Sequence, residues 1–351
     1  MKAILSDLAA LRSVESVTDV RRAVAELKIR WQLDGEPGTA TPDHRFLAAQ
    51  LEQIAAARTL ERARYYIDRL ERSLTAVRTN GVNDINLNRW QAYDDILTDS
   101  LWLFERRDNS GVHSAGYWGN FIPQIPYQML RRYTRPGEWV LDTFAGAGTT
   151  LIESQRLGRH ALGIELQPRV ADDARRLIAA EPNPHRTVAE VVVGDSCSLD
   201  YRALLMSYGQ QSVHLVIMHP PYHDIIRFSD DPRDLSNAGS VDEFLERMRQ
   251  VVARAATVLN VGRHLVVVIG DKYAAGEWIP LGFRTMDVVL KEGFALKSII
   301  VKNFEQTTAK RRQRELWRYR ALAGGFYVFK HEYIFVFSRC AHTSPTRLSG
   351  S

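Results

Sequence analysis

Short apolar segments alternate with helix-like stretches through most of the chain after about residue 115. The apolar segments, each of strand length, are Trp139–Leu141, Ala161–Ile164, Val191–Val193, Leu215–Met218, His264–Ile269, Ser298–Val301 and Tyr333–Phe337. Stretches with helical periodicity separate several of them, namely Thr149–Leu157, Val170–Ala180, Val241–Leu259 and Gly282–Lys291. This alternation predicts an α/β fold with a mostly parallel sheet of about seven strands and helices on both faces. Ligands of such sheets bind at the carboxyl ends of the strands.

Residues 1–110 have a different texture, with helical periodicity, no clear strand, and a loop rich in glycine and proline at about 34–43. They predict a separate N-terminal helical region. Arginines interleaved with glutamates on the stretch Phe46–Val77 fit a solvated face of a helical bundle, and also a face that binds nucleic acid or a second copy. The net charge of +5 and the pI near 9.2 fit a polyanionic partner without requiring one.

The number of cysteines and the hydropathy of the chain indicate in which cellular compartment the protein acts. The two cysteines, Cys197 and Cys340, exclude a disulfide framework and a multi-cysteine zinc site, and no metal is expected. The N-terminus lacks the apolar core of a signal peptide, and no apolar run approaches the ~20 residues that span a bilayer. These features predict a cytoplasmic protein without a membrane partner.

The segment from Val140 to Thr150 reads VLDTFAGAGTT, a strand that ends in an acidic residue and turns directly into a helix. Glycines at 146 and 148 let the backbone turn sharply and let a ligand approach closely. No Gly-Lys-Ser/Thr follows, so the turn is not a P-loop, and the third glycine of the dinucleotide fingerprint is missing. Glu165 and Asp195 then end the next two predicted strands, which places three acids in register after three strands.

The string D-x-F-x-G-x-G-T-T resembles the S-adenosylmethionine (SAM) binding motif of amino-group DNA methyltransferases. The resemblance covers about residues 113–340 and implies a Rossmann-like methyltransferase sheet with SAM as cofactor. It implies that Asp142 holds the methionine end, Phe144 packs on the cofactor, Glu165 binds the ribose hydroxyls and Asp195 binds the adenine amino group. The other cofactor residues that it implies are Phe121, Ile122, Pro123, Gly146, Gly148, Thr149, Thr150 and Ser196.

A second motif, His219-Pro220-Pro221-Tyr222, follows the apolar strand Leu215–Met218. Two prolines fix the backbone and remove donors, which leaves carbonyl acceptors for a base amino group. The motif resembles the (Asp/Asn/Ser)-Pro-Pro-(Tyr/Phe/Trp) signature of N6-adenine and N4-cytosine methyltransferases. We expect one amino hydrogen to bond the Pro220 carbonyl and the other to bond the His219 side chain, while Tyr222 can stack on a base flipped from the duplex. The following stretch, His223–Asn237, resembles the loop that closes over base and cofactor.

His219 departs from the family signature. A neutral histidine accepts one hydrogen bond, so the expected chemistry survives, whereas a protonated one accepts none. We therefore expect activity to fall at acidic pH, and a fall only well below pH 5 would count against this role. Because histidine is not acidic, it favours N4-cytosine slightly over N6-adenine.

The expected organisation is a helical region at 1–110 for target recognition or dimerisation, a methyltransferase domain at 111–340 with a basic insertion at 303–330, and a polar tail at 341–351. The insertion interleaves basic and aromatic side chains that suit phosphate contacts and base stacking. These candidate DNA contacts are Arg311, Arg312, Arg314, Trp317, Arg318 and Tyr319. A solvated basic helix is the alternative.

The sequence therefore predicts a DNA methyltransferase that acts on double-stranded DNA. A homodimer and a cognate restriction or defence system stay open as partners. The alternatives are an RNA base-amino methyltransferase and a catalytically silent subunit that uses the fold to hold nucleic acid. No RNA-binding module is recognisable in the sequence, and the intact glycines, carboxylates and Pro-Pro-Tyr argue against a silent fold.

Overall fold

The structure is a computed structural model that describes residues 2–33, 42–113, 116, 119–304 and 314–341. Its internal contacts divide the chain into two compact units, Met1–Ile96 and Leu97–Ser351. The helical unit thus ends earlier than the boundary expected near residue 110. The reason is that β1 (Leu101–Trp102) pairs in parallel with β9 (Phe294–Asn303) and so joins the sheet of the second unit.

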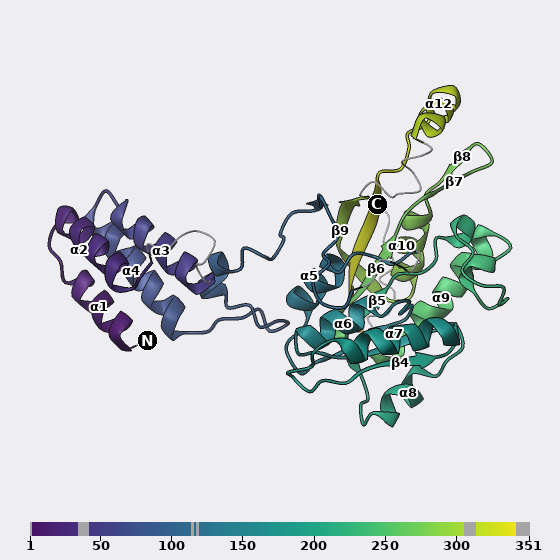
Figure 1. Cartoon of the computed structure of the whole chain (residues 1–351), viewed down its shortest axis with the longest axis horizontal. Coiled ribbons are helices and arrows are strands. Elements are labelled where there is room, and N and C mark those ends of the chain that lie inside the picture. The colour runs from purple at the N-terminus through teal and green to yellow at the C-terminus, as the bar shows by residue number, and fades with distance from the viewer. Residues whose placement is uncertain (1, 34–41, 114–115, 117–118, 305–313, 342–351) are drawn as a thin grey trace, which may run out of the picture. The chain divides into compact units, whose positions relative to one another are not determined.

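The first unit is a helical bundle (Figure 1). Its helices are α1 (Lys2–Arg12), α2 (Val17–Arg30), α3 (Pro42–Ala55) and α4 (Leu60–Thr75), followed by the 3-10 helix η1 (Leu87–Ala92). The periodic stretch Phe46–Val77 is therefore two helices, and α4 begins after Thr59, whose side chain accepts the Arg62 N–H at 3.2 Å. On α4, Ala63, Ile67 and Leu70 are buried at helical spacing against the other helices, which makes one apolar core for the unit.

The second unit contains the sheet. Its strands are β1, β2 (Trp139–Asp142), β3 (His160–Glu165), β4 (Ala189–Val193), β5 (Val213–Met218), β6 (Leu259–Ile269), β7 (Lys272–Ala274), β8 (Glu277–Ile279), β9 and β10 (His331–Arg339). Its helices are α5 (Gln124–Tyr133), α6 (Thr149–Arg156), α7 (Pro168–Ala180), α8 (Tyr201–Ser207), α9 (Val241–Val258), α10 (Leu281–Lys291) and α12 (Arg314–Gly324), with the 3-10 turns η2 (His223–Ile225) and η3 (Leu235–Asn237).

The strand order is β1-β9-β10-β6-β5-β2-β3-β4. All seven expected strands are present, β1 adds an eighth, and the expected α/β fold class is confirmed. Strand β10 runs antiparallel to β6 and β9, and the other pairs in this sheet are parallel. The chain moves outward from β2 through β3 to β4 and then returns to place β5 on the other side of β2. The carboxyl ends of β2 and β5 therefore form a switch point, where such sheets bind ligands.

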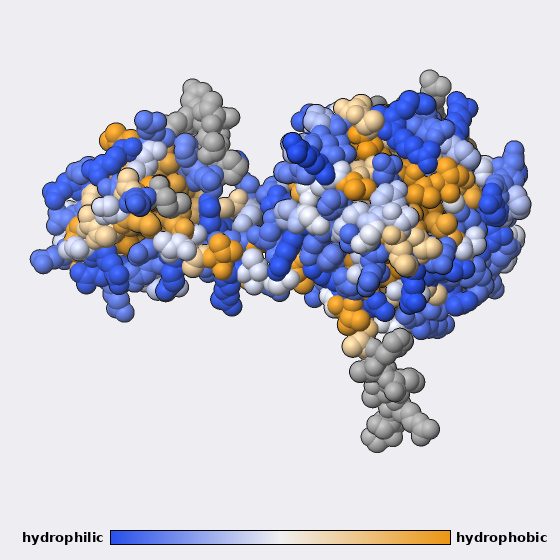
Figure 2. Space-filling view, turned by 90° about the horizontal axis from the view of Figure 1, so that it is seen from below, coloured by the Kyte–Doolittle hydropathy of each residue, from blue (hydrophilic) through white to orange (hydrophobic). Residues whose placement is uncertain are grey.

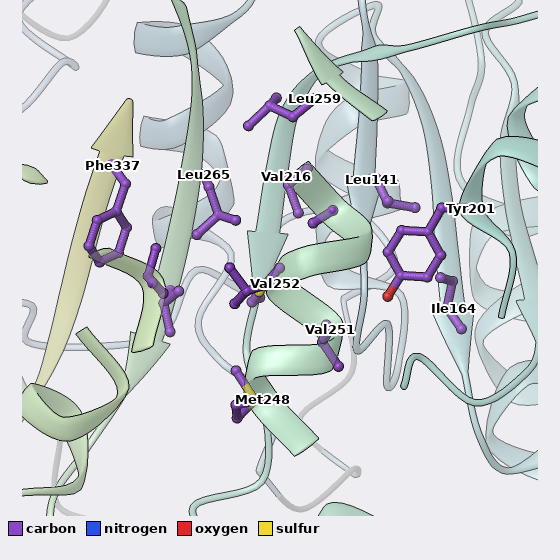
Figure 3. Close-up of a cluster of buried hydrophobic side chains, with 14 of the residues drawn as sticks. Leu141, Ile164, Tyr201, Val216, Met248, Val251, Val252, Leu259, Leu265 and Phe337 are labelled. Atoms are coloured by element: carbon purple, nitrogen blue, oxygen red, sulfur yellow. The ribbon is translucent and has the colours of Figure 1, made fainter. Parts of the chain in front are cut away.

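Both faces of the sheet are buried. Leu141, Val216 and Leu265 point to a core that includes Val251 and Val252 of α9 (Figure 3). The alternating residues Val140, Leu215 and Val266 are also fully buried but belong to the opposite face. Helices α8, α9 and α10 pack together on one face, and α5, α6 and α7 pack together on the other. The helices on the two faces hold in place the strand ends that carry the site.

The surface of each unit is mostly hydrophilic on the side seen in Figure 2, with separate apolar patches. None of the helices in the described part of the chain has both the length and the apolar content needed to cross a membrane.

Candidate functional site

One pocket opens at the switch point, at the carboxyl ends of β2, β3, β4 and β5. It has about 730 Å³ of empty space, including its open mouth, which suits a small-molecule ligand. Many of the predicted cofactor and catalytic residues line this pocket: Phe121, Phe144, Gly146, Glu165, Asp195, Ser196, His219, Pro220 and Pro221. The remaining predicted ones are not part of the wall: Ile122, Pro123, Asp142, Gly148, Thr149, Thr150 and Tyr222.

The glycine-rich turn forms the floor of the pocket. Gly146 and Gly148 have φ of +49° and +78°, a region in which a side chain would strain the backbone. A Cβ at Gly148 would also lie only 3.2 Å from Ile178, on the packed α7. Gly148 caps α6, so the N-terminal N–H groups of that helix lie at the turn. The sequence therefore needs glycine here for both conformation and packing.

Asp142, at the end of β2, is buried behind the turn and holds its shape. Its Oδ1 accepts the Phe144 N–H at 2.9 Å. Burial raises the pKa of Asp142 to about 6, although the Phe144 N–H bonded to Oδ1 and the nearby Thr150 hydroxyl act in the opposite direction. The family-based expectation places Asp142 at the methionine end, but its visible role is to fix the turn.

Glu165 ends β3 and lies on the wall. Its Oε2 accepts the Gly146 N–H at 3.0 Å and its Oε1 accepts the Gln167 N–H at 2.9 Å. Burial raises the pKa of Glu165, those two hydrogen bonds lower it, and Asp234 and Asp142 raise it further. Two of the roughly four lone-pair sites of the carboxylate are thus engaged, which leaves capacity for ligand hydroxyls.

Asp195 follows β4 on the same wall. Its Oδ1 accepts the Cys197 N–H at 2.8 Å, and its Oδ2 accepts the Ser198 hydroxyl at 2.9 Å. The neighbouring Ser196 hydroxyl donates to the Thr143 carbonyl and ties this loop to the glycine-rich turn. Of the three acids predicted in register, Glu165 and Asp195 therefore line one pocket, whereas Asp142 lies buried behind the glycine-rich turn.

The segment before α5 covers another side of the pocket. Phe121 lines it, with its ring centroid 4.8 Å from that of His219. Ile122 and Pro123 instead enter the first turn of α5, where the Ile122 carbonyl accepts the Ile125 N–H at 3.1 Å. Because the chain turns into the helix there, only the first of these three predicted residues reaches the pocket.

The His-Pro-Pro-Tyr motif follows β5 directly, and its first three residues line the pocket. His219 Nε2 lies 3.2 Å from the Tyr222 hydroxyl oxygen, and the two rings meet edge to face. The Tyr222 hydroxyl donates to Glu332 Oε2 at 2.7 Å. Glu332 Oε1 in turn lies 3.0 Å from Lys302 Nζ, and both of these side chains are 5% exposed. A buried polar chain therefore runs from His219 to strands β10 and β9.

Burial lowers the pKa of His219 to about 4, while Glu332 raises it and Lys302 lowers it further. The imidazole is therefore neutral at pH 7 and can accept a hydrogen bond. The acid limit expected from sequence assumed a histidine near its ordinary pKa of about 6.5. With the lowered pKa, the neutral form persists to about pH 4, so a fall in activity there fits the acceptor role.

The loop after the motif supplies wall residues that the sequence did not single out: Phe228, Arg233, Asp234 and Leu235. The expected closing segment His223–Asn237 contains them all. Asp234 accepts the Ser229 hydroxyl at 2.7 Å and the Ser236 hydroxyl at 2.8 Å, which fixes the loop over the pocket. Asn120 is also on the wall and accepts the Thr149 hydroxyl at 2.7 Å. The sequence motif did not single out Asn120, because its contact with Thr149 forms only when the segment before α5 folds against α6.

Among the described residues that line the pocket, Glu165, Asp195 and Asp234 are carboxylates and Arg233 is the only arginine or lysine. An excess of carboxylates attracts a cationic ligand.

The predicted nucleic-acid contacts lie elsewhere. Arg311 and Arg312 fall outside the described residues, and Arg314 begins α12 but its side chain is likewise outside them. Trp317 and Tyr319 line a groove between α12 and the β7–β8 hairpin. Tyr273 and Phe326 also line this groove, and their rings stack with centroids 4.0 Å apart. Figure 1 shows this helix and hairpin extending beyond the sheet. Tyr319 is 70% exposed, and Arg318 is exposed on the same helix.

A family of DNA methylases, N6_N4_Mtase, matches residues 52–176 and 213–347, which is most of the chain. The chain belongs to this family. Membership agrees with the cofactor expected from the glycine-rich motif, S-adenosylmethionine.

Curated relatives match over shorter segments. The chain is 36% identical over 75 residues to the Type II methyltransferase M.MjaII of Methanocaldococcus jannaschii, covering 21% of this chain and 14% of that protein. It is 31% identical over 85 residues to the Type II methyltransferase M.MthZI of Methanothermobacter thermautotrophicus, covering 24% of this chain and 23% of that protein. The chain thus spans less than a quarter of the length of either relative. The crystal structure of TrmN from Thermus thermophilus aligns with 62% of this chain and 49% of its own at 16% identity and a TM-score of 0.38, too low to support any argument.

Proposed function

We propose that this chain transfers the methyl group of SAM to the exocyclic amino group of a base in double-stranded DNA. The observation that carries the proposal is that one pocket is lined both by the carboxylates Glu165 and Asp195 and by His219-Pro220-Pro221. Membership of the DNA methylase family and the Type II methyltransferases among its relatives support it.

The donors and acceptors of the pocket fit SAM. Glu165 keeps free lone pairs for the two ribose hydroxyls, and Asp195 keeps free lone pairs for the adenine amino group. The excess of carboxylates suits a cofactor that carries a positive sulfur and a positive amino group. Phe144 and Phe121 offer apolar surface to the same ligand, and the glycine-rich turn lets it approach the backbone.

The part of the lining formed by His219, Pro220 and Pro221 would hold the base. A flipped base would place its amino group against His219 and the carbonyl of Pro220, which are both acceptors, while Tyr222 would stack on the ring. With both N–H bonds engaged, the nitrogen lone pair is directed toward the cofactor side of the pocket. Positioning of this kind lets a weak nucleophile react without a covalent enzyme intermediate.

Held by Glu165 and Asp195, SAM would supply a methyl group on a cationic sulfur to the amino nitrogen, and the electron pair of the broken carbon–sulfur bond would remain on sulfur. The nitrogen then loses one proton. His219, already hydrogen-bonded to the amino group, is the first acceptor for that proton and passes it to water, since its low pKa gives it up readily.

The target base is proposed as cytosine, modified at N4, in preference to adenine at N6. A neutral acceptor at the first motif position resembles the serine of cytosine enzymes more than the acid of adenine enzymes. DNA contacts are assigned to Trp317, Arg318 and Tyr319 on α12. The N-terminal helical unit would serve target recognition or dimerisation. A cognate restriction partner is proposed from the names of the relatives.

Mass spectrometry of nucleosides tests the proposal. Duplex DNA, single-stranded DNA and RNA are each incubated with the protein and isotopically labelled SAM, with His219→Ala as the control. Labelled N4-methylcytosine from duplex DNA, absent with the variant, is the expected result. Labelled N6-methyladenine would correct the base, label only in RNA would replace the DNA substrate, and SAM binding with no transfer to any nucleic acid would leave a silent fold.

A further inference from the structure

A buried ion pair lies behind the catalytic motif, on strands that carry no recognised motif residue. Lys302 on β9 and Glu332 on β10 are directly opposite each other in the antiparallel register. Their charged atoms are 3.0 Å apart and both side chains are 5% exposed. Desolvating two charges is costly, and a well-packed apolar pair often fills such a place at least as well. The ion pair therefore calls for a reason beyond stability.

The carboxylate of Glu332 divides its two oxygens between two partners. Oε1 faces Lys302, and Oε2 accepts the Tyr222 hydroxyl at 2.7 Å. As a carboxylate paired with Lys302, Glu332 is an acceptor only. Burial, with Glu332 adding to it, raises the pKa of Tyr222 well above its usual range, so the phenol keeps its hydrogen. That single hydrogen is therefore directed to Glu332.

The direction of this bond decides the tautomer of His219. The Tyr222 oxygen, having given its hydrogen to Glu332, faces His219 Nε2 at 3.2 Å with only lone pairs. A hydrogen bond at this contact requires a proton on Nε2. In the neutral imidazole the lone pair is then on Nδ1, which has no hydrogen-bond partner among the described residues. The Phe121 ring, 4.8 Å from the imidazole, packs against it and helps hold its orientation.

We propose that Glu332 is a positioning residue that acts through Tyr222 to hold His219 in the Nε2–H tautomer, so that the Nδ1 lone pair accepts the amino group of the target base. This rests on the proposed methyl transfer and deepens it. A neutral histidine nitrogen is either a donor or an acceptor toward its substrate, whereas both oxygens of the ionised aspartate found in the family signature are acceptors. The ion pair removes that ambiguity.

Nitrogen NMR of histidine-labelled protein tests the tautomer without any substrate, and His219→Asn identifies the signal. The wild type should show the Nε2–H form at pH 7. In Glu332→Gln, Lys302 engages the amide oxygen, the amide NH₂ then donates to Tyr222, and the Tyr222 hydroxyl turns to donate to Nε2. The variant should therefore show the Nδ1–H form. Retention of the Nε2–H form in this variant would overturn the proposal.

Tyr222→Phe gives a second variant that keeps the ion pair and cuts only the link to His219. The proposal expects a mixture of both tautomers, and a pure Nε2–H signal contradicts it. This variant covers the case in which Glu332→Gln does not fold.

Kinetics separate a positioning role from a structural one. Glu332→Gln should lower kcat by about 100-fold with the KM for SAM little changed, since the wrong tautomer presents a donor to the base. In the His219→Asn background, which has no tautomer to fix, the same change should cost no more than about twofold. Equal losses in both backgrounds would mean a structural role. A wild type that shows the Nε2–H form but methylates no nucleic acid would refute the proposed function and leave the tautomer assignment standing.

Discussion

The lining of the pocket has two parts that are built in different ways. We call them the proposed cofactor wall (Glu165, Asp195 and the glycine-rich turn) and the proposed catalytic wall (His219, Pro220 and Pro221). The cofactor wall is made of backbone turns and of the acids that end successive parallel strands, so Glu165 and Asp195 are placed by the sheet itself. The catalytic wall depends on side chains distant in sequence, since Tyr222 meets Glu332 110 residues away. The proposed cofactor wall is therefore placed by local structure, whereas the contacts of the proposed catalytic wall form only when distant segments of the chain come together. The two should fail separately when mutated.

The largest expected effect falls on the catalytic wall. His219→Ala removes an acceptor for the amino group and should lower the rate of methyl transfer at saturating SAM by about 10²–10³-fold. Single-turnover transfer of labelled methyl to duplex DNA measures this rate. His185→Ala, at an exposed histidine outside the pocket wall, is the matched control and should keep the wild-type rate. A variant at 219 that is as fast as this control would remove the catalytic role.

The next effect falls on the cofactor wall. Glu165→Gln replaces a charged acceptor of the ribose hydroxyls and also weakens its bond to the Gly146 N–H, so the Kd for SAM should rise about 10- to 100-fold. Calorimetric titration measures the Kd. Glu190→Gln, at an exposed position on β4, should leave it unchanged. Unaltered SAM binding in Glu165→Gln would show that β3 does not carry the ribose site.

A pH-dependent difference in stability sharpens the comparison. Burial lowers the pKa of His219 to about 4 in the folded state, while the unfolded chain titrates near 6.5. Between these values the unfolded state binds more protons, so the free energy of unfolding falls as the pH drops from about 6.5 towards 4. The expected loss from this residue is about 1–3 kcal/mol. Urea unfolding should show that His219→Asn loses less stability than the wild type over this range, and identical pH profiles would mean that His219 titrates normally.

The smallest effect is expected away from the pocket. Trp317→Ala or Tyr319→Ala should weaken duplex DNA binding by about 1 kcal/mol, or roughly fivefold in Kd. Arg318→Ala should reduce the slope of log K against log salt by about 1 if it contacts a phosphate. Fluorescence anisotropy at several salt concentrations measures both. Leu322→Ala, on an equally exposed face of α12, is the control. Equal losses in this control and the aromatic variants would assign α12 a packing role instead.

The sequence predicted what local pattern determines. The alternation of apolar segments predicted the strands. Glu165 and Asp195 lie on one pocket because the carboxyl ends of parallel strands share one edge of the sheet, whereas Asp142 is buried behind the turn. The positive φ of Gly146 and Gly148 could also be predicted from the sequence, because a sharp turn directly after a strand requires a conformation that glycine adopts without strain.

Other features needed the fold. Ile122 and Pro123 enter α5 and miss the pocket, although the motif includes them. Lys302 and Glu332 have no pattern of their own, because the antiparallel pairing of β9 with β10 brings them together behind Tyr222. The pKa of His219 was likewise beyond the sequence, since it depends on how far the fold removes the ring from water.

The division of the pocket is tested most directly by a calorimetric titration of SAM into His219→Ala, beside the wild type and Glu165→Gln. We expect the wild type to bind SAM and His219→Ala to bind it with a Kd within about twofold of the wild type. A Kd for His219→Ala that rises as far as that of Glu165→Gln, or a wild type that binds no SAM, would contradict it.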